Sequence, residues 1–298
     1  MRTKPTVLEG TMEDIWSIRI YRGESPLKID TSKNAFVASI TKDDVTDIPA
    51  SFVADPFMIH FEEKWYLFME IMNAETEIGE IGLVTSVDGT KWEYQQVVLK
   101  EDYHLSYPFI FRHNEVFYMI PETLNANAIR LYKARNFPYD WEYQTDLIKG
   151  KYADPTLFQH DDKWWMFTYS FELGNLNLFS SNDLIGPYTE HHKSPLIIKN
   201  KRTTRPAGKV INDNDRLIRL CQDGYPKYGS SVRAFEITKL TQSDYREVEL
   251  SESPVLQKSE EKNQWNSNGM HHLDSHKITS NKWLVCVDGC YSDILNRI

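Results

Sequence analysis

Val53-Ala54-Asp55-Pro56-Phe57-Met58-Ile59 sets the pattern for the whole chain of 298 residues. An Asp-Pro step opens a short apolar run, a polar turn follows at 62–64, and the aromatic strand Trp65-Tyr66-Leu67-Phe68 completes a hairpin. The same order of apolar run, turn and apolar strand returns in four further copies, the last of which lacks the proline. These copies begin at Ser106, Ala153, Arg205 and Gly269.

The copies recur at a nearly constant distance. The prolines of the first four copies lie at positions 56, 108, 155 and 206, so they are 52, 47 and 51 residues apart. A strand-only repeat of about 50 residues is typical of a β-propeller, in which each repeat forms one four-stranded blade. The sequence therefore predicts an all-β, five-bladed propeller that occupies residues 1–298 as a single domain.

The blade boundaries follow from the repeats, and we expect blades at about 52–100, 104–150, 152–200, 203–258 and 262–290. Upstream of them, residues 16–21 alternate large and polar side chains as a half-buried strand does. Propellers often close by adding an N-terminal strand to the last blade, which removes an open edge. We therefore expect strand 16–21 to complete the fifth blade.

Composition limits the classes of partner. The net charge of −9 argues against nonspecific binding to nucleic acid or to an anionic membrane, although a local basic pocket remains compatible with it. The chain contains no run of 18 apolar residues, and polar and acidic residues follow its N-terminus where a signal peptide would have an apolar core. Three cysteines indicate reduced thiols rather than disulfides or a zinc site. We expect a cytoplasmic protein with no membrane-spanning segment, metal or cofactor, and the sequence carries no signal for an oligomeric state.

The repeated proline points to the propeller axis. Proline cannot donate to a sheet ladder, so it suits the innermost strand of a blade, which is an edge strand facing the central channel. The residue before a proline is normally extended. We expect these four residues to converge at the mouth of the channel: Asp55, Tyr107, Asp154 and Arg205.

Carboxylates at matching positions have both a structural and a chemical interpretation. Asp55 and Asp154 either brace the turns of the inner strands or carry out chemistry at the axis, and the preference for Asp favours chemistry. Glu70 and Glu122 each lie 14 residues past a proline, at the end of a second strand. Both interpretations stay open for Glu70, because the end of a second strand can lie far from the channel mouth. For Glu122 we favour function, because Pro121 redirects the strand end.

Several motifs resemble one known family over about residues 14–290. The family is named for the N-terminal domain of plant glucosamine inositolphosphorylceramide transferase, and it occurs in bacteria as standalone proteins. It is more distantly similar to the five-bladed propellers of glycoside hydrolase families 43, 32 and 68. The motifs that carry the resemblance are Phe52-Val53-Ala54-Asp55-Pro56-Phe57, His104-Leu105-Ser106-Tyr107-Pro108, Tyr118-Met119-Ile120-Pro121-Glu122, Arg205-Pro206-Ala207-Gly208, Gln222-Asp223, Tyr228-Gly229 and Gly269-Met270-His271-His272.

The resemblance implies roles and also a departure. In those hydrolases a first-blade Asp is the base or nucleophile and a third-blade Asp orients it or stabilises the transition state, which match Asp55 and Asp154. Their proton donor is a fourth-blade Glu, whereas residues 203–209 contain Arg205 and Lys209 but no carboxylate. Glycoside hydrolysis needs an acid for the leaving group. A phosphate or diphosphate leaving group instead needs cations and hydrogen-bond donors.

We therefore expect a carbohydrate-active enzyme that transfers a sugar from a phosphate-activated donor to a glycan or lipid acceptor, as in surface polysaccharide or glycolipid assembly. Asp55 is the expected base, Asp154 its partner and Glu122 an auxiliary acid or sugar ligand. The expected substrate-binding residues are Tyr107, Arg205, Lys209, Asp223, Trp265, His271 and His272. Because successive strand residues point to opposite faces, we expect only one of the two histidines to face the pocket.

Two alternatives stay open. The first is a glycoside hydrolase or transglycosidase in which Glu122 or Asp223 has become the acid. The second is a sugar-binding propeller without catalysis. Aromatic rings at Tyr107 and Trp265 are the best candidates for stacking on a sugar, whereas the second-strand tryptophans, such as Trp65 and Trp164, are better explained as core.

Overall fold

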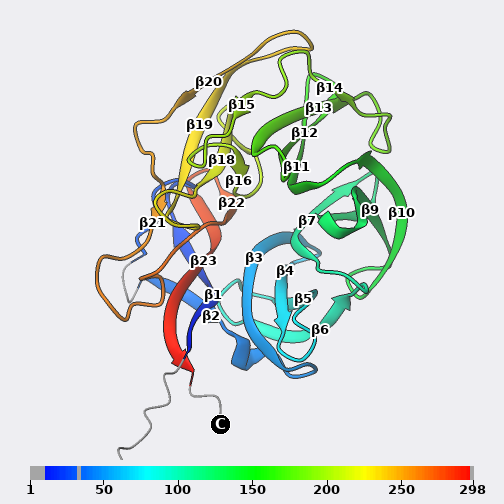
Figure 1. Cartoon of the computed structure of the whole chain (residues 1–298). Coiled ribbons are helices and arrows are strands. Elements are labelled where there is room, and N and C mark those ends of the chain that lie inside the picture. The colour runs from blue at the N-terminus through cyan, green and yellow to red at the C-terminus, as the bar shows by residue number, and fades with distance from the viewer. Residues whose placement is uncertain (1–10, 32–34, 296–298) are drawn as a thin grey trace, which may run out of the picture.

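The computed structural model describes residues 11–31 and 35–295, and these form five antiparallel sheets around a central axis (Figure 1). This arrangement confirms the predicted all-β, five-bladed propeller. The helical segments among the described residues are two single 3₁₀ turns, η1 (Lys42–Asp44) and η2 (Leu124–Ala126). No helix in this part of the chain is long and apolar enough to cross a membrane.

The first three blades follow one another along the chain, each running from the axis outward. Blade one consists of β3 (Ala50–Phe61), β4 (Lys64–Asn73), β5 (Gly79–Ser86) and β6 (Glu93–Leu99). Blade two consists of β7 (Ser106–His113), β8 (Val116–Glu122), β9 (Ala128–Asn136) and β10 (Asp140–Lys149). Blade three consists of β11 (Tyr152–His160), β12 (Lys163–Ser170), β13 (Asn175–Ser181), β14 (Thr189–Glu190) and β15 (Ile197–Ile198).

The last two blades are less regular. Blade four divides its inner strand into β16 (Arg205–Pro206) and β17 (Ile211–Asp213), followed by β18 (Arg216–Asp223), β19 (Ser231–Leu240), β20 (Tyr245–Glu249) and β21 (Leu256–Gln257). Blade five has the order β22 (Leu273–Thr279), β23 (Lys282–Leu295), β1 (Thr11–Gly23) and β2 (Phe36–Ile40).

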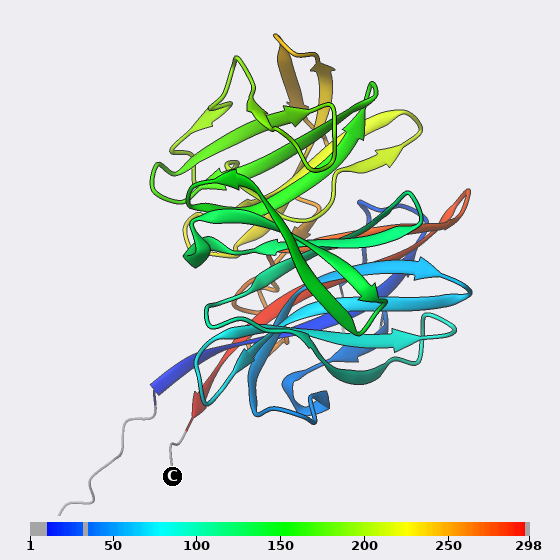
Figure 2. The same ribbon diagram turned by 90° about the vertical axis from the view of Figure 1, so that its right-hand side faces the viewer.

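The ring closes through the two ends of the chain. Strand β1 pairs with β23 over its whole length, from Thr11 opposite Leu295 to Gly23 opposite Trp283, and the two strands lie side by side in Figure 2. This pairing confirms the predicted role of the N-terminal strand. The structure adds β2 as a second N-terminal strand at the outer edge of the blade, which the sequence analysis did not predict.

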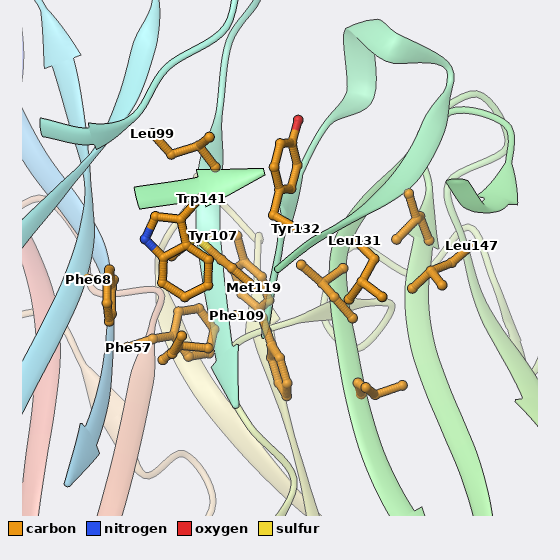
Figure 3. Packing of buried hydrophobic residues seen from close by; sticks show 14 of the residues in the cluster. Phe57, Phe68, Leu99, Tyr107, Phe109, Met119, Leu131, Tyr132, Trp141 and Leu147 are labelled. Carbon is orange, nitrogen blue, oxygen red and sulfur yellow. The ribbon is translucent and has the colours of Figure 1, made fainter. Parts of the chain in front are cut away.

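Aromatic and aliphatic side chains fill the space between neighbouring blades. Figure 3 shows this packing between blades one and two, where Phe57 and Phe68 face Tyr107, Phe109 and Trp141. The ring centroids of Phe68 and Trp141 are 5.7 Å apart, in an edge-to-face arrangement. Contacts of this kind hold each sheet against the next, because a propeller blade buries both of its faces.

A bulge interrupts the innermost strand in each of the first three blades. The register with the second strand shifts between Ala54 and Phe57, and the equivalent shifts lie at 106–109 and 153–156. The residues before the prolines, Asp55, Tyr107 and Asp154, have φ of 50°, 46° and 51°. The expectation of extended backbone at these positions is therefore wrong. Because the bulge leaves these residues out of the ladder, the backbone can turn into the left-handed region and the proline costs no ladder hydrogen bond.

We predict that Phe68→Ala lowers the free energy of unfolding by about 3–5 kcal/mol, because it leaves a cavity between two blades that other side chains fill only in part. Chemical denaturation followed by tryptophan fluorescence measures the change. Val87→Ala in the same blade is the matched control, since Val87 is 76% exposed and its loss should change stability by less than about 0.5 kcal/mol. Equal effects of the two substitutions would contradict this account of the core.

Candidate active site

The bulges of the inner strands and the ends of the second strands lie at the same end of the propeller axis. Each second strand runs antiparallel to its inner strand, so its last residues pair with the first residues of the inner strand. Glu70 pairs with Ala54, Glu122 with Ser106 and Gln222 with Arg205. Glu70, which was open to either interpretation, is buried and belongs to the same electrostatic group as Asp55 and Glu122.

Hydrogen bonds between neighbouring blades hold the bulges in place. The backbone N–H of Asp55 donates to Asp288 Oδ2 at 3.2 Å. The N–H of Tyr107 donates to Asp55 Oδ2, and that of Asp154 to Glu122 Oε2, both at 3.2 Å. In each case a carboxylate of one blade accepts from the residue before the proline of the next blade. The suggestion that Asp55 braces an inner strand therefore agrees with these contacts, whereas the Asp154 carboxylate accepts from Arg205 and Gln222.

Asp55 lies at the centre of the group. Its Oδ1 is 3.9 Å from His271 Nδ1 and 3.8 Å from His272 Nδ1. Burial raises the pKa of Asp55 to about 7, and the charges of Asp288 and Asp154 add to this rise, whereas His271 and Arg205 oppose it. An aspartate with this pKa exchanges its proton at neutral pH, which suits a general base.

Asp154, Arg205 and Glu122 form a second part of the group. Arg205 donates through Nε to Asp154 Oδ2 at 2.5 Å, and its Nη2 lies 3.6 Å from Glu122 Oε2. Gln222 Nε2 donates to Asp154 Oδ2 at 3.2 Å. Burial raises the pKa of Glu122 to about 8, with the charge of Asp154 as the next cause and Arg205 opposing it. Glu122 is consequently protonated at neutral pH.

Arg205 is the group through which this cluster reaches solvent, since its side chain is 25% exposed while that of Asp154 is 2% exposed. Its guanidinium lies over the rings of Tyr228 and Tyr169, with centroid distances of 5.4 and 5.8 Å. Tyr228 is itself exposed at the surface. The geometry therefore presents one face of a fixed cation next to aromatic rings, which is a suitable arrangement for a phosphate or a sugar.

Both histidines flank Asp55, although successive residues of a regular strand would point to opposite faces. The reason is local: residues 270–272 precede β22 and do not alternate as a strand does. The backbone N–H groups of His271 and His272 both donate to Asp288 Oδ1 at 3.0 Å. His271 stacks on Trp16 with the ring centroids 4.1 Å apart, and its Nδ1 is 2.7 Å from Asp288 Oδ2.

The two histidines differ in charge. Burial would lower the pKa of His271, but the carboxylates of Asp288 and Asp55 outweigh burial and raise it. The opposite result holds for His272, whose pKa burial lowers to about 4. His272 is fully enclosed, and its ring packs edge-to-face with that of Phe57, with the ring centroids 4.5 Å apart. His271 can therefore carry a positive charge beside Asp55, whereas His272 is neutral.

Other predicted residues lie away from the cluster. Lys209 donates to Met58 O at 2.8 Å and pairs with Asp274, and it borders a cavity of about 390 Å³ at the opposite end of the inner strands. Asp223 accepts from Arg202 and Arg233 at 3.3 and 3.1 Å. These ion pairs hold Asp223 in a structural position and leave it a poor candidate for the acid.

The two aromatic candidates are also placed differently from the expectation of ligand contact. Trp265 lies under the guanidinium of Arg19, 4.4 Å from the ring centroid, and packs against Gly289 as a half-buried residue beside the core of blades four and five. Tyr107 is completely buried, and its hydroxyl lies 2.7 Å from Thr156 Oγ1 and accepts from Gly208 N–H at 2.8 Å. Tyr107 connects three blades across the axis, so we assign it to the support of the site.

Sequence reasoning missed several residues of the cluster. The offset of 14 residues that indicated Glu70 and Glu122 also gives Tyr169, which lies beneath Arg205. Asp288 lies in the one repeat without a proline, so no spacing marked it. Trp16 was recognised only as part of the closing strand, although it stacks on His271.

Three residues have the chemistry of metal ligands. Asp55, His271 and Asp288 offer atoms that lie within 4.8 Å of one another. Mixed carboxylate and imidazole ligands suit a divalent cation. Asp288 also accepts three backbone N–H groups and lies beside His271 Nδ1, so its carboxylate has partners within the protein.

Comparison with known proteins places the chain in a family. Residues 9–290 match the family model described as glucosamine inositolphosphorylceramide transferase 1, N-terminal. The chain belongs to this family. It is 31% identical over 299 residues to glucosamine inositolphosphorylceramide transferase 1 of Oryza sativa subsp. japonica and 32% identical over 316 residues to that of Arabidopsis thaliana. These matches cover 93% and 96% of this chain but 40% of each relative.

Solved structures with the same fold include glycoside hydrolases. A putative glycoside hydrolase from Parabacteroides distasonis has a TM-score of 0.58 and 11% identity, with 79% of this chain and 86% of that chain covered. The catalytic domain of a family 62 α-L-arabinofuranosidase from Coprinopsis cinerea has a TM-score of 0.56 and 12% identity, with coverage of 91% and 97%. At these identities the similarity shows the fold alone.

We predict that Asp55→Asn and Glu122→Gln each become more stable relative to the original chain as the pH rises. The folded protein holds protons on Asp55 and Glu122 up to about pH 7 and 8, whereas the unfolded chain releases them near their ordinary values of 3.8 and 4.5. Stability is therefore lost as the pH rises through this window, by about 4 kcal/mol for Asp55 and about 5 kcal/mol for Glu122, and a neutral amide avoids that loss.

Melting temperatures measured from about pH 5 to pH 9 test this prediction. The exposed Asp161→Asn in the turn between β11 and β12 is the matched control and should follow the pH dependence of the original chain. A gain in stability that is the same at every pH would show that burial does not hold protons on these two carboxylates.

Proposed function

We propose that this chain transfers a sugar from a phosphate-activated donor to a glycan or lipid acceptor. The observation that carries the proposal is the fourth-blade position, where Arg205 rather than a carboxylate faces Asp154 and Glu122. Membership of a family whose curated relatives are named transferases supports it. The propeller hydrolases with the same fold support a carbohydrate substrate.

Asp55 acts as the base in this mechanism. Its pKa of about 7 lets it accept the proton of an acceptor hydroxyl at neutral pH. The acceptor oxygen then forms a bond to the anomeric carbon while the bond from that carbon to the phosphate oxygen breaks. The phosphate leaves with the electron pair and needs no proton. His271, next to Asp55 and Asp288, adjusts the charge around the base.

Arg205 stabilises the departing phosphate. A guanidinium binds phosphate through two parallel hydrogen bonds, and Asp154 already fixes its orientation through Nε. The exposed part of Arg205 is then available to the donor. Asp154 faces the reacting sugar from the third blade and stabilises positive charge that develops at the anomeric carbon.

Glu122 favours a second candidate, a glycoside hydrolase or transglycosidase. With a pKa of about 8 it keeps its proton at neutral pH, as the acid in glycoside hydrolysis must. In this reaction Glu122 protonates the leaving oxygen and Asp55 acts as base or nucleophile. A sugar-binding propeller without catalysis is the third candidate, and it would need the same cluster only for affinity.

We predict that Asp55→Asn reduces turnover by at least about 10²-fold, the contribution of a general base, while substrate binding is retained. Release of nucleoside diphosphate from a panel of nucleotide sugars, and of nitrophenol from nitrophenyl glycosides, measures turnover. Thermal stabilisation by the same compounds measures binding. Asp161→Asn is the control. Full turnover by Asp55→Asn would show that Asp55 is not the base, whereas binding without turnover in the original chain would leave only the binding module.

We predict that Arg205→Lys raises KM for the nucleotide sugar about tenfold, because lysine keeps the charge but loses the paired hydrogen bonds. Arg135→Lys, at an exposed ion pair in blade two, is the matched control and should leave KM unchanged.

Glu122→Gln distinguishes the transferase from the hydrolase. A transferase retains most of its activity in this variant. A hydrolase loses most of its glycoside cleavage, and the rate of the cleavage that remains no longer falls above about pH 8.

A further inference from the structure

Large exposed apolar side chains gather on one part of the rim around the candidate site. Eleven such side chains are exposed among the described residues, and five of them lie on the connections of blades three and four or in the short strand β15: Phe171, Leu173, Ile198, Tyr225 and Tyr228. Their exposed fractions range from 46% to 65%. Single exposed apolar residues are ordinary, but a group of this size at one place marks an interaction surface.

The segments that carry these side chains touch one another. The N–H of Phe171 donates to Lys151 O at 3.0 Å, and that of Lys199 donates to Gly174 O at 3.0 Å. The N–H of Gly224 donates to Lys201 O at 2.7 Å. We name the continuous surface formed by residues 149–151, 171–174, 198–205 and 224–228 the basic rim.

The basic rim has a charge opposite to that of the chain. Its four segments contain seven cations and one anion, in a protein whose net charge is −9. Three of the cations pair with acids outside the segments, Arg202 with Asp223, Arg205 with Asp154 and Lys227 with Asp14, and the surface keeps a net positive charge when these acids are counted. The cations are Lys149, Lys151, Lys199, Lys201, Arg202, Arg205 and Lys227, and the anion is Glu172. The connections of blade one at 41–47, 74–78 and 100–104, at the same end of the propeller, contain seven acids and two lysines. The site is therefore bordered by a basic, apolar side and an acidic side.

This composition is that of a surface that rests on a membrane. Apolar side chains insert at the level of the lipid headgroups while neighbouring lysines bind the charged lipids. Phe171 and Leu173 lie at the tip of the hairpin between β12 and β13, where insertion disturbs no core packing. The acidic side is repelled by the same surface, which would hold the propeller at a fixed tilt.

We propose that the basic rim docks this protein on the surface of a membrane that contains anionic lipids, with Arg205 and the candidate site next to the bilayer. Docking in this position would bring the site to substrates whose headgroups project from the membrane. The inference depends on the composition of the surface and not on the reaction, so vesicle binding and turnover are separate measurements.

Flotation with lipid vesicles tests the proposal. The probes are vesicles of phosphatidylcholine alone and vesicles in which about one third of the lipid is phosphatidylserine. We expect the protein to float with the anionic vesicles only. We expect the double variants Phe171→Ser/Leu173→Ser and Lys199→Glu/Lys201→Glu each to weaken binding by about tenfold or more.

Matched controls lie at the other end of the blades, in or next to the turns there. Val87→Ser/Ile278→Ser removes two exposed apolar side chains, and Lys91→Glu/Lys282→Glu reverses two exposed charges. Both should bind vesicles as the original chain does, and unchanged melting temperatures would confirm that every variant folds.

Three outcomes would overturn the proposal. The first is the absence of binding to anionic vesicles, and the second is equal loss of binding in the rim and control variants. In the third, Phe171→Ser/Leu173→Ser binds as tightly as the original chain and soluble polyphosphate displaces the vesicles. That result would assign the rim to soluble polyanions instead of a bilayer.

Discussion

The hydrogen bonds from backbone N–H groups to carboxylates around the axis are the interaction on which this structure depends. Three inner strands leave their ladders at a bulge, and each bulge leaves a buried N–H without a ladder partner. A buried N–H without a hydrogen bond would cost about 1–3 kcal/mol. Asp288, Asp55 and Glu122 each satisfy the bulge of the following blade. The acids that serve chemistry are thus the ones that join the blades.

This double role explains the unusual charge of the centre. Five carboxylates, those of Asp55, Glu70, Glu122, Asp154 and Asp288, are buried around one axis, with Arg205 and His271 as the nearby cations. Because the cations are fewer than the acids, some acids retain protons. Glu122 and Glu70 each keep a proton, because burial and the neighbouring acids raise their pKa values. Asp288 stays ionised, because His271 and three N–H donors lower its pKa against the effect of burial.

The sequence predicted the fold well, because a repeat near 50 residues fixes the number of blades and Asp-Pro steps fix the innermost strands. It also predicted that Asp55, Asp154, Glu122, Arg205 and His271 come together. It failed where chain direction changes locally, at the left-handed residues before the prolines. It also gave no sign of the irregular segment that places both histidines beside Asp55. Trp265 and Asp223 show a different limit. Their side chains are held by Arg19 and by two arginines, and such pairings depend on neighbours that are distant in sequence.

The closure of the ring by β1 and β23 has a consequence for how the site forms. Trp16 comes from the first described strand and Asp288 from the last, and both contact His271. The surroundings of Asp55 are thus incomplete until the last strand has been synthesised and has paired with the first. A growing chain on the ribosome cannot hold a working site, however many blades have already folded. Any activity of this cluster therefore requires that β1 and β23 have already closed the ring.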